Sequence, residues 1–338
     1  MILAFVVGYV PADLVFGKDV WTCTLASASV NVQRVLGLTR RVDAMARTGR
    51  SAAEVAETRS PAVRRRELGA LLRALRTERR LTIEQVADEL LCSPSKVSRL
   101  ETGQRGASPR DIRDLSELYE IDPAQREHLA ELAKEGKSHG WWQSYDLPYA
   151  TYVGLEAEAV SICDFEPGAV PGLLQTVDYA RAIHEGALPR LSPETIDQRL
   201  EVRRNRQAIL TRAEPPAPQF RAIIDEAVLH RIVGGASVMS AQLDHVIKLS
   251  RLPNVTVQVL GYEAGAHPAL DSTFILLEFE DPVPGLVYVE GLVGQLYLDR
   301  SQDLRRYGLV FERLSTISLS KQKSLDLMSR ICADYGKM

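Results

Sequence analysis

Between residues 64 and 136, apolar side chains recur at the spacing of one helical face, in short segments separated by turn signals. The leucines of segment 68–75 follow the i, i+3, i+4, i+7 spacing. Residues 82–85 have the form of a capping box, which starts a helix. A polar residue followed by proline starts three more helices, at Ser93-Pro94, Ser108-Pro109 and Asp122-Pro123. The pattern therefore predicts five short helices packed as a compact all-α domain.

Beyond residue 136 the pattern mixes both periodicities. Short runs rich in β-branched and aromatic residues predict strands at 161–166, 220–224, 255–260, 274–279 and 286–290. Helical periodicity predicts helices at 176–185, 192–212, 226–232 and 238–251, and one long helix at 301–335. Strands separated by helices in some places and by turns in others indicate an α+β domain with one sheet and a long C-terminal helix.

Length and composition fit this division into domains. The chain has 338 residues, of which 45% are hydrophobic and 25% charged, as in a soluble globular protein of two domains with a tail. Its net charge of −3 is unevenly distributed. Residues 61–113 carry 12 basic and 7 acidic side chains, whereas residues 114–338 carry 22 and 32. We therefore expect only the first of these segments to meet an anionic partner.

The domain boundaries predicted from these patterns are 1–60, 61–136 and 137–338. Residues 1–60 have little apolar periodicity and no convincing signal peptide, and we interpret them as a disordered arm or as the result of a mis-assigned start, with Met45 as the alternative first residue. The cysteines are far apart and form no CxxC pair, which favours a reducing, intracellular compartment over a disulfide scaffold or zinc cluster.

The segments 82–90 and 93–103 form a pair of short helices joined by a tight turn, which is the helix-turn-helix arrangement. On a helical wheel of the second segment, Val97 and Leu100 lie on the side that would pack against the first helix. The opposite side carries Ser95, Ser98 and Arg99, with Lys96 at the flank. An apolar back and a polar front are what a recognition helix in the major groove needs.

The sequence LTIEQVA at 81–87, followed by SPSKVSRLETG at 93–103, resembles the lambda-repressor-like, XRE-type helix-turn-helix family over about residues 66–122. The remainder resembles the actinobacterial regulators in which this module precedes a large domain of unknown function. The segments PGLLQT at 171–176, PNVTVQV at 253–259 and GAH at 265–267 carry that second resemblance. It brings no known chemistry, but such regulators are often encoded beside a small protein that acts as partner.

By position in the motif, the resemblance implies that Ser95 and Arg99 face base edges, since an arginine can bond guanine in a bidentate manner. The flanking side chains suit phosphates. The predicted DNA-binding residues are Thr82, Ser93, Ser95, Lys96, Ser98, Arg99, Gln104 and Arg105.

The sequence departs from the family in two places. Pro94 stands where the family often has a glutamine or another polar side chain that contacts bases. Its presence shifts recognition toward DNA shape and phosphate contacts. Leu91 stands where a turn glycine is common, so we expect a differently shaped turn. The arginines of segment 64–66 are either further DNA contacts or an ordinary solvated surface.

Other chemistry is weakly indicated, and we predict neither an enzyme nor a cofactor or metal site. Glu226 and His230 have the spacing of a metal pair but also that of an ordinary surface pair. Asp271-Ser272 lacks the glycine pattern of a nucleophile elbow. Trp141-Trp142 either lines a ligand pocket or anchors one domain on another.

We therefore predict a sequence-specific transcriptional regulator that binds double-stranded DNA as a homodimer, resides in the cytoplasm at the nucleoid and does not contact a membrane. Its C-terminal domain would bind a small ligand or a small protein partner, or would only dimerise the chain. The alternatives are a fusion enzyme whose α+β domain acts on a small molecule, and an antitoxin-like DNA-binding member of a two-protein module.

Overall fold

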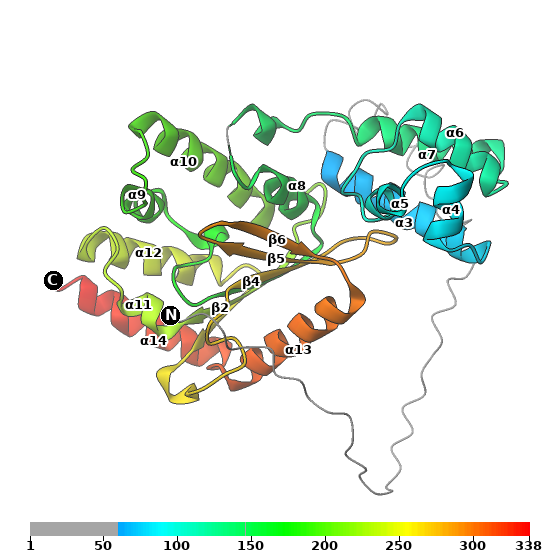
Figure 1. Cartoon of the computed structure of the whole chain (residues 1–338). Helices are drawn as coiled ribbons and strands as arrows, with labels where there is room; N and C mark the ends of the chain where they lie inside the picture. The colour runs from blue at the N-terminus through cyan, green and yellow to red at the C-terminus, as the bar shows by residue number, and fades with distance from the viewer. Residues whose placement is uncertain (1–59, 146) are drawn as a thin grey trace, which may run out of the picture. The chain divides into compact units, whose positions relative to one another are not determined.

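A computed structural model describes residues 60–145 and 147–338 (Figure 1). The N-terminal arm or mis-assigned start predicted for residues 1–60, including Met45, lies outside the described residues except for Ser60. The described residues belong to one compact unit. None of the helices they form is long and apolar enough to cross a bilayer.

The first part of the described chain is entirely helical, and its five predicted helices are confirmed. Four of them begin with an N-cap side chain that accepts a backbone hydrogen bond, as the sequence indicates for Thr82, Ser93, Ser108 and Asp122. Their apolar faces enclose one core that includes Leu72, at 1% exposure. The helices are α3 (Pro61–Glu78), α4 (Ile83–Glu89), α5 (Pro94–Glu101), α6 (Pro109–Leu118) and α7 (Pro123–Glu135).

The second part has one sheet of six strands in the order β3-β2-β1-β4-β5-β6. Strands β1, β2 and β3 are parallel to one another, while β4, β5 and β6 continue the sheet in antiparallel pairs. The predicted α+β class with one sheet is confirmed. The strands are β1 (Ser161–Glu166), β2 (Gln219–Asp225), β3 (Val255–Leu260), β4 (Phe274–Glu278), β5 (Leu286–Gly291) and β6 (Gly294–Leu298).

Helices cover both faces of this sheet (Figure 1). One face packs in the larger core, which includes Tyr152 of α8 and Met239 of α12, and the other packs against Phe311 and Leu314 of α13. The α-helices of this part are α8 (Ala150–Glu158), α9 (Val177–Glu185), α10 (Pro193–Gln207), α11 (Glu226–His230), α12 (Ala236–Leu249), α13 (Ser301–Ile317) and α14 (Lys321–Tyr335). Short 3₁₀ helices are η2 (Trp141–Ser144), η3 (Gly172–Leu174), η4 (Ala208–Leu210) and η5 (Tyr262–Ala264).

The long helix predicted at 301–335 is interrupted, and forms α13 and α14. The break docks on β3, because Leu319 N donates to Val259 O at 2.9 Å and Ser324 Oγ accepts from Val259 N at 2.9 Å. Ser320 then caps α14 by accepting from the backbone N–H of Lys323. The break therefore depends on a strand about sixty residues earlier in the chain, and the local periodicity of 301–335 does not indicate it.

Candidate nucleic-acid interface

Helices α4 and α5 form the helix-turn-helix pair that the sequence predicts. Thr82 and Gln85 complete a reciprocal capping box at α4, with Thr82 N donating to Gln85 Oε1 at 2.8 Å. Ser93 Oγ accepts from Lys96 N at 3.2 Å and starts α5. Both N-cap side chains predicted to face DNA are thus already engaged with their own helices. They fix where each helix begins.

The two helices pack through apolar side chains. Val86 and Ala87 of α4 are fully buried, and Val97 and Leu100 of α5 are 2% and 3% exposed. This apolar contact is the one predicted from the helical wheel. It leaves the opposite side of α5 facing outward.

The outward side of α5 carries Ser95 and Arg99, both of which are exposed, while Ser98 is half-buried. Arg99 Nε donates to the Ser95 backbone oxygen at 3.2 Å, which holds the arginine stem along the helix. Among the described residues no carboxylate forms an ion pair with Arg99. Its guanidinium therefore remains free to bond a partner outside the chain.

Lys96 lies at the flank of α5 and has a different environment. Its Nζ is 2.5 Å from Oδ1 of Asp111, a buried residue on α6 whose other oxygen accepts from Ser108 N at 2.9 Å. Burial alone would raise the pKa of Asp111, but the Lys96 and Ser108 donors hold it below its ordinary value. A phosphate contact by Lys96 would therefore compete with an internal ion pair.

Gln104 and Arg105 are exposed in the turn after α5. This turn depends on Gly103, which has φ of +70°, as the sequence predicts for the residue that ends the helix. A Cβ at Gly103 would also lie 2.7 Å from the backbone nitrogen of Arg66. The glycine thus lets the turn approach α3 and fixes where the two polar side chains emerge.

A partly buried ion pair connects α3 to α5. Arg76 Nε and Nη2 donate to the two carboxylate oxygens of Glu101 at 2.6 and 2.9 Å. Arg76 Nη1 also donates to the Leu81 backbone oxygen at 2.8 Å, just before α4. No local pattern indicates this pair, because the two residues are 25 positions apart in the chain.

The turn between α4 and α5 corrects one expectation. We expected Leu91 to impose a different turn shape, but it adopts φ of +48°, the conformation that a glycine would take. Its side chain is 94% exposed, so no burial offsets the strain. The leucine is tolerated in the ordinary turn.

Leu91→Gly is accordingly expected to raise the free energy of unfolding by about 0.5–1 kcal/mol, because glycine adopts positive φ without a Cβ clash. Thermal unfolding of the full chain measures this. Leu91→Ala is the matched control, since it removes the exposed side chain but keeps the Cβ. Equal stability of the two variants would show that the backbone is not strained.

The arginines of segment 64–66 are buried or half-buried and bond within the chain, which corrects the alternative of an ordinary solvated surface. Arg64 forms ion pairs with Glu67 and Glu135, and Arg65 Nη1 donates to the Gly136 backbone oxygen at 2.9 Å. Arg66 is 7% exposed, and its Nη2 donates at 3.0 and 3.1 Å to the backbone oxygens of residues 284 and 285. These side chains connect α3 to its neighbours.

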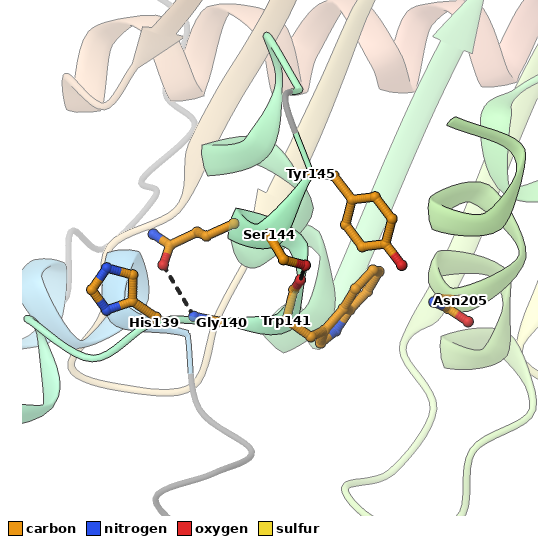
Figure 2. Close-up of a pocket in the computed structure, with 7 residues that line it drawn as sticks. His139, Gly140, Trp141, Ser144, Tyr145 and Asn205 are labelled. Carbon is orange, nitrogen blue, oxygen red and sulfur yellow. Dashed lines mark hydrogen bonds between the residues drawn. The ribbon is translucent and has the colours of Figure 1, made fainter. Parts of the chain in front are cut away.

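The two adjacent tryptophans have different environments: Trp142 is a buried packing residue, and Trp141 lines a hollow. Trp142 is 6% exposed and packs so closely that a Cβ at Gly154 would lie 2.5 Å from its ring. Trp141 instead borders an open hollow of about 470 Å³ together with Tyr145 and Asn205 (Figure 2). The side chains that line this hollow are aromatic or polar and include His139, with no carboxylate, lysine or arginine among them.

The remaining candidate pairs have the geometry of surface contacts. His230 Nε2 lies 3.5 Å from Glu226 Oε1, one helical turn apart, and Ser272 Oγ donates to Asp271 Oδ1 at 3.4 Å without a histidine bonded to it. Within residues 60–145 and 147–338, no group of three or more histidine, cysteine or acidic side chains is arranged to hold a metal ion. The three cysteines of this part, Cys92, Cys163 and Cys332, are free.

Comparison with known proteins adds two family matches. A helix-turn-helix domain model matches residues 67–129, which span α4 and α5 and the helices that support them. The model described as "Domain of unknown function (DUF5753)" matches residues 149–330, more than half of the chain. No curated protein and no solved structure matches the chain at a significant level.

Proposed function

We propose that this chain, which belongs to the family defined by the domain of unknown function DUF5753, is a sequence-specific DNA-binding transcriptional regulator of the lambda-repressor-like, XRE type. The helix-turn-helix domain indicates DNA binding, and the outward face of α5 supports a direct role in reading bases. The observation that carries the proposal is Arg99, which is exposed and free of any acidic partner among the described residues. It stands on a helix whose back is buried and braced by Arg76 and Glu101.

In this arrangement Ser95 and Arg99 reach base edges in the major groove, and Gln104 and Arg105 contact phosphates beside it. Thr82 and Ser93 orient backbone N–H groups at the starts of their helices, and Ser98 lines the edge of the interface. The net charge of +5 on residues 61–113 favours approach to DNA. Lys96 contributes to the local potential while remaining paired with Asp111.

Arg99→Ala is expected to weaken binding to the preferred site by about 1–3 kcal/mol and to relax selectivity at one base pair in each half-site. The site itself is obtained by selecting bound sequences from a random duplex pool with the unaltered protein. Binding isotherms on that site and on its single-base variants give both quantities. Unchanged affinity and selectivity would contradict the assignment of α5 as the recognition helix.

Arg126→Ala is the matched control, because it removes one exposed positive charge from α7, in the same helical region. We expect it to leave base selectivity unchanged. An equal loss of selectivity in both variants would mean that net charge, rather than position on α5, explains the effect.

The functional form is proposed to be a homodimer on two half-sites about one helical turn apart, since one short recognition helix reads few bases. Analytical ultracentrifugation of the complex with the selected duplex is expected to show two chains per duplex. One chain bound tightly to a site without two-fold repetition would contradict the dimer.

The part of the chain from residue 137 onward is proposed to act away from DNA, and the whole protein to act at the nucleoid in the cytoplasm without enzymatic activity. Residues 114–338 carry 32 acidic and 22 basic side chains, so phosphates would repel them. The role of the part from residue 137 onward would be to regulate the helix-turn-helix domain by binding a ligand or a small protein, or to hold the dimer together.

A further inference from the structure

Strand β6 forms an open edge of the six-stranded sheet. It comes last in the strand order, so β5 is the one described strand that pairs with it (Figure 1). Its five residues, Gly294–Leu298, include no charged side chain and no proline, and their register with β5 has no bulge. Proteins use charges, prolines or bulges to keep a strand edge from pairing with another chain. The edge of β6 has none of these devices.

Apolar side chains are exposed on the same hairpin. Leu292 and Val293, in the turn between β5 and β6, are fully exposed, and Leu296 in the middle of β6 is 60% exposed. The strand that carries Leu296 is held in place, because the ring of Tyr297 lies 5.4 Å from that of Tyr288, which is 2% exposed. A fixed strand thus presents apolar side chains to solvent, which favours contact with another surface.

The backbone of β6 alternates between bonding to β5 and facing outward. Gly291 and Gly294 close the hairpin around a turn of two residues, so they form a hydrogen-bonded pair. Such pairs alternate along an antiparallel ladder, so Leu296 also bonds to β5. Gln295 and Tyr297 therefore direct their N–H and C=O groups outward. No other backbone group of the described chain bonds to either residue.

We propose that β6 pairs with β6 of a second copy of this chain, antiparallel and about a two-fold axis at Leu296, which joins the two sheets into one. Gln295 then exchanges both backbone bonds with the partner's Tyr297, and Tyr297 does so with the partner's Gln295. Leu296 faces the partner's Leu296 in a non-hydrogen-bonded pair, where side chains approach most closely. All outward backbone groups of both strands are thereby satisfied.

The strand itself selects an axis at Leu296. An outward residue must face an outward residue, so the nearest alternative axes pass through Gln295 or Tyr297. An axis at Gln295 would place Tyr297 opposite the partner's Val293, which belongs to the turn. An axis at Tyr297 would place Gln295 opposite the partner's Asp299, beyond the end of β6. The axis at Leu296 keeps all of the pairing within the two strands.

A second copy fits this edge in size and charge. Leu298 lies opposite the partner's Gly294, which leaves room for the leucine side chain, and all five facing positions are uncharged. Two identical edges also bury the same residues on both sides, as a two-fold interface requires. That the dimer presents two recognition helices to two half-sites depends on the regulator function proposed above, whereas the strand pairing itself does not.

Disulfide cross-linking of the full chain, without DNA, tests the pairing. In Leu296→Cys the two new thiols face each other across the axis, within reach of a disulfide. We expect oxidised glutathione to link this variant into a covalent dimer at least about tenfold faster than the unaltered chain, whose own four cysteines set the background. A rate no higher than this background would overturn the proposal.

Val293→Cys is the matched control for exposure. Val293 is more exposed than Leu296, so random collisions would link it at least as fast. In the proposed dimer the two copies of residue 293 lie on opposite sides of the axis, about 20 Å apart, which is too far for a disulfide. Equal rates in the two variants would mean that collision, and not strand pairing, explains the cross-link.

Leu296→Arg is expected to separate the copies, because it places two positive charges at the closest pair of the interface. Sedimentation without DNA should show a dimer of the unaltered chain, and a dissociation constant at least about tenfold higher for the variant. Ile232→Arg is the matched control, since Ile232 is 58% exposed and follows α11 and β2, which three strands separate from β6. Unchanged dimerisation of Leu296→Arg, or a monomeric unaltered chain, would contradict the pairing.

Gln295→Pro tests the backbone bonds separately from the side chains. The N–H of Gln295 points away from β5, so proline removes a bond to the partner and none within the chain. We expect a weaker dimer, and unchanged dimer affinity would mean that the strands do not pair. Arg99→Ala should remain a dimer, so failure of DNA binding and failure of the pairing are distinguishable.

Discussion

Glu101→Gln is expected to lower the free energy of unfolding of the helical region by about 1–3 kcal/mol. The Glu101 side chain is 5% exposed and that of its partner Arg76 is 14% exposed, so the substitution leaves a partly buried guanidinium without a counter-charge. The loss would fall on the contact between α3 and α5. It would therefore also weaken specific DNA binding, through the position of α5 and not through any contact of Glu101 with DNA.

Hydrogen exchange of the α3 and α5 amides in the full chain measures this loss region by region. Glu78→Gln is the matched control at the end of α3, where the side chain is exposed, and it should change stability by no more than about 0.5 kcal/mol. The double substitution Arg76→Met, Glu101→Met should recover most of the loss, since it removes both charges. Equal exchange in Glu101→Gln and Glu78→Gln would mean that the ion pair contributes nothing.

The helical region was predictable because its signals are local. Four of the five helix starts depend on a cap within three residues, as at Thr82 and Ser108, and the structure has these caps where the sequence places them. The buried and outward sides of α5 also follow from periodicity alone, because Val97 and Leu100 recur at helical spacing.

Other elements were missed because distant contacts decide them. Helix α8 has Tyr152, Val153 and Leu155 all buried, so it lacks the polar face that would have marked a helix. Strand β6 is a short edge strand of mostly half-exposed residues, and only its pairing with β5 defines it. The break before α14 depends on contacts with β3.

The same reason limits what the sequence says about sites. Arg99 could be placed on an outward face from its spacing, but the exposed state of Arg99 and the paired state of Lys96 depend on which acids fold nearby. The burial of Arg66 against residues 284 and 285 joins segments more than two hundred residues apart. Asp164 is buried on β1, which nothing in the local sequence indicates.

Arg206→Leu is expected to cost about 3–5 kcal/mol in the unfolding of the α+β part, because it leaves Glu156 buried without a counter-charge. The Glu156 side chain is 1% exposed and that of Arg206 is 10% exposed. Burial lowers the pKa of Arg206, but Glu156 outweighs burial and raises it well above its ordinary value. Glu156 also accepts from the Tyr152 hydroxyl at 2.6 Å, so the pair connects three elements of the interior.

Glu156→Gln is expected to cost less than Arg206→Leu, and the difference reports on Asp164. Burial, Glu166 and Glu156 raise the pKa of Asp164, and Arg206 lowers it. Removing Glu156 therefore lets Asp164 ionise more readily and supply part of the missing negative charge, whereas removing Arg206 leaves Glu156 buried without a counter-charge. Chemical denaturation followed by hydrogen exchange of the β1 and β5 amides measures both losses. An equal or larger loss in Glu156→Gln would mean that Asp164 does not compensate the charge of Arg206 when Glu156 is absent.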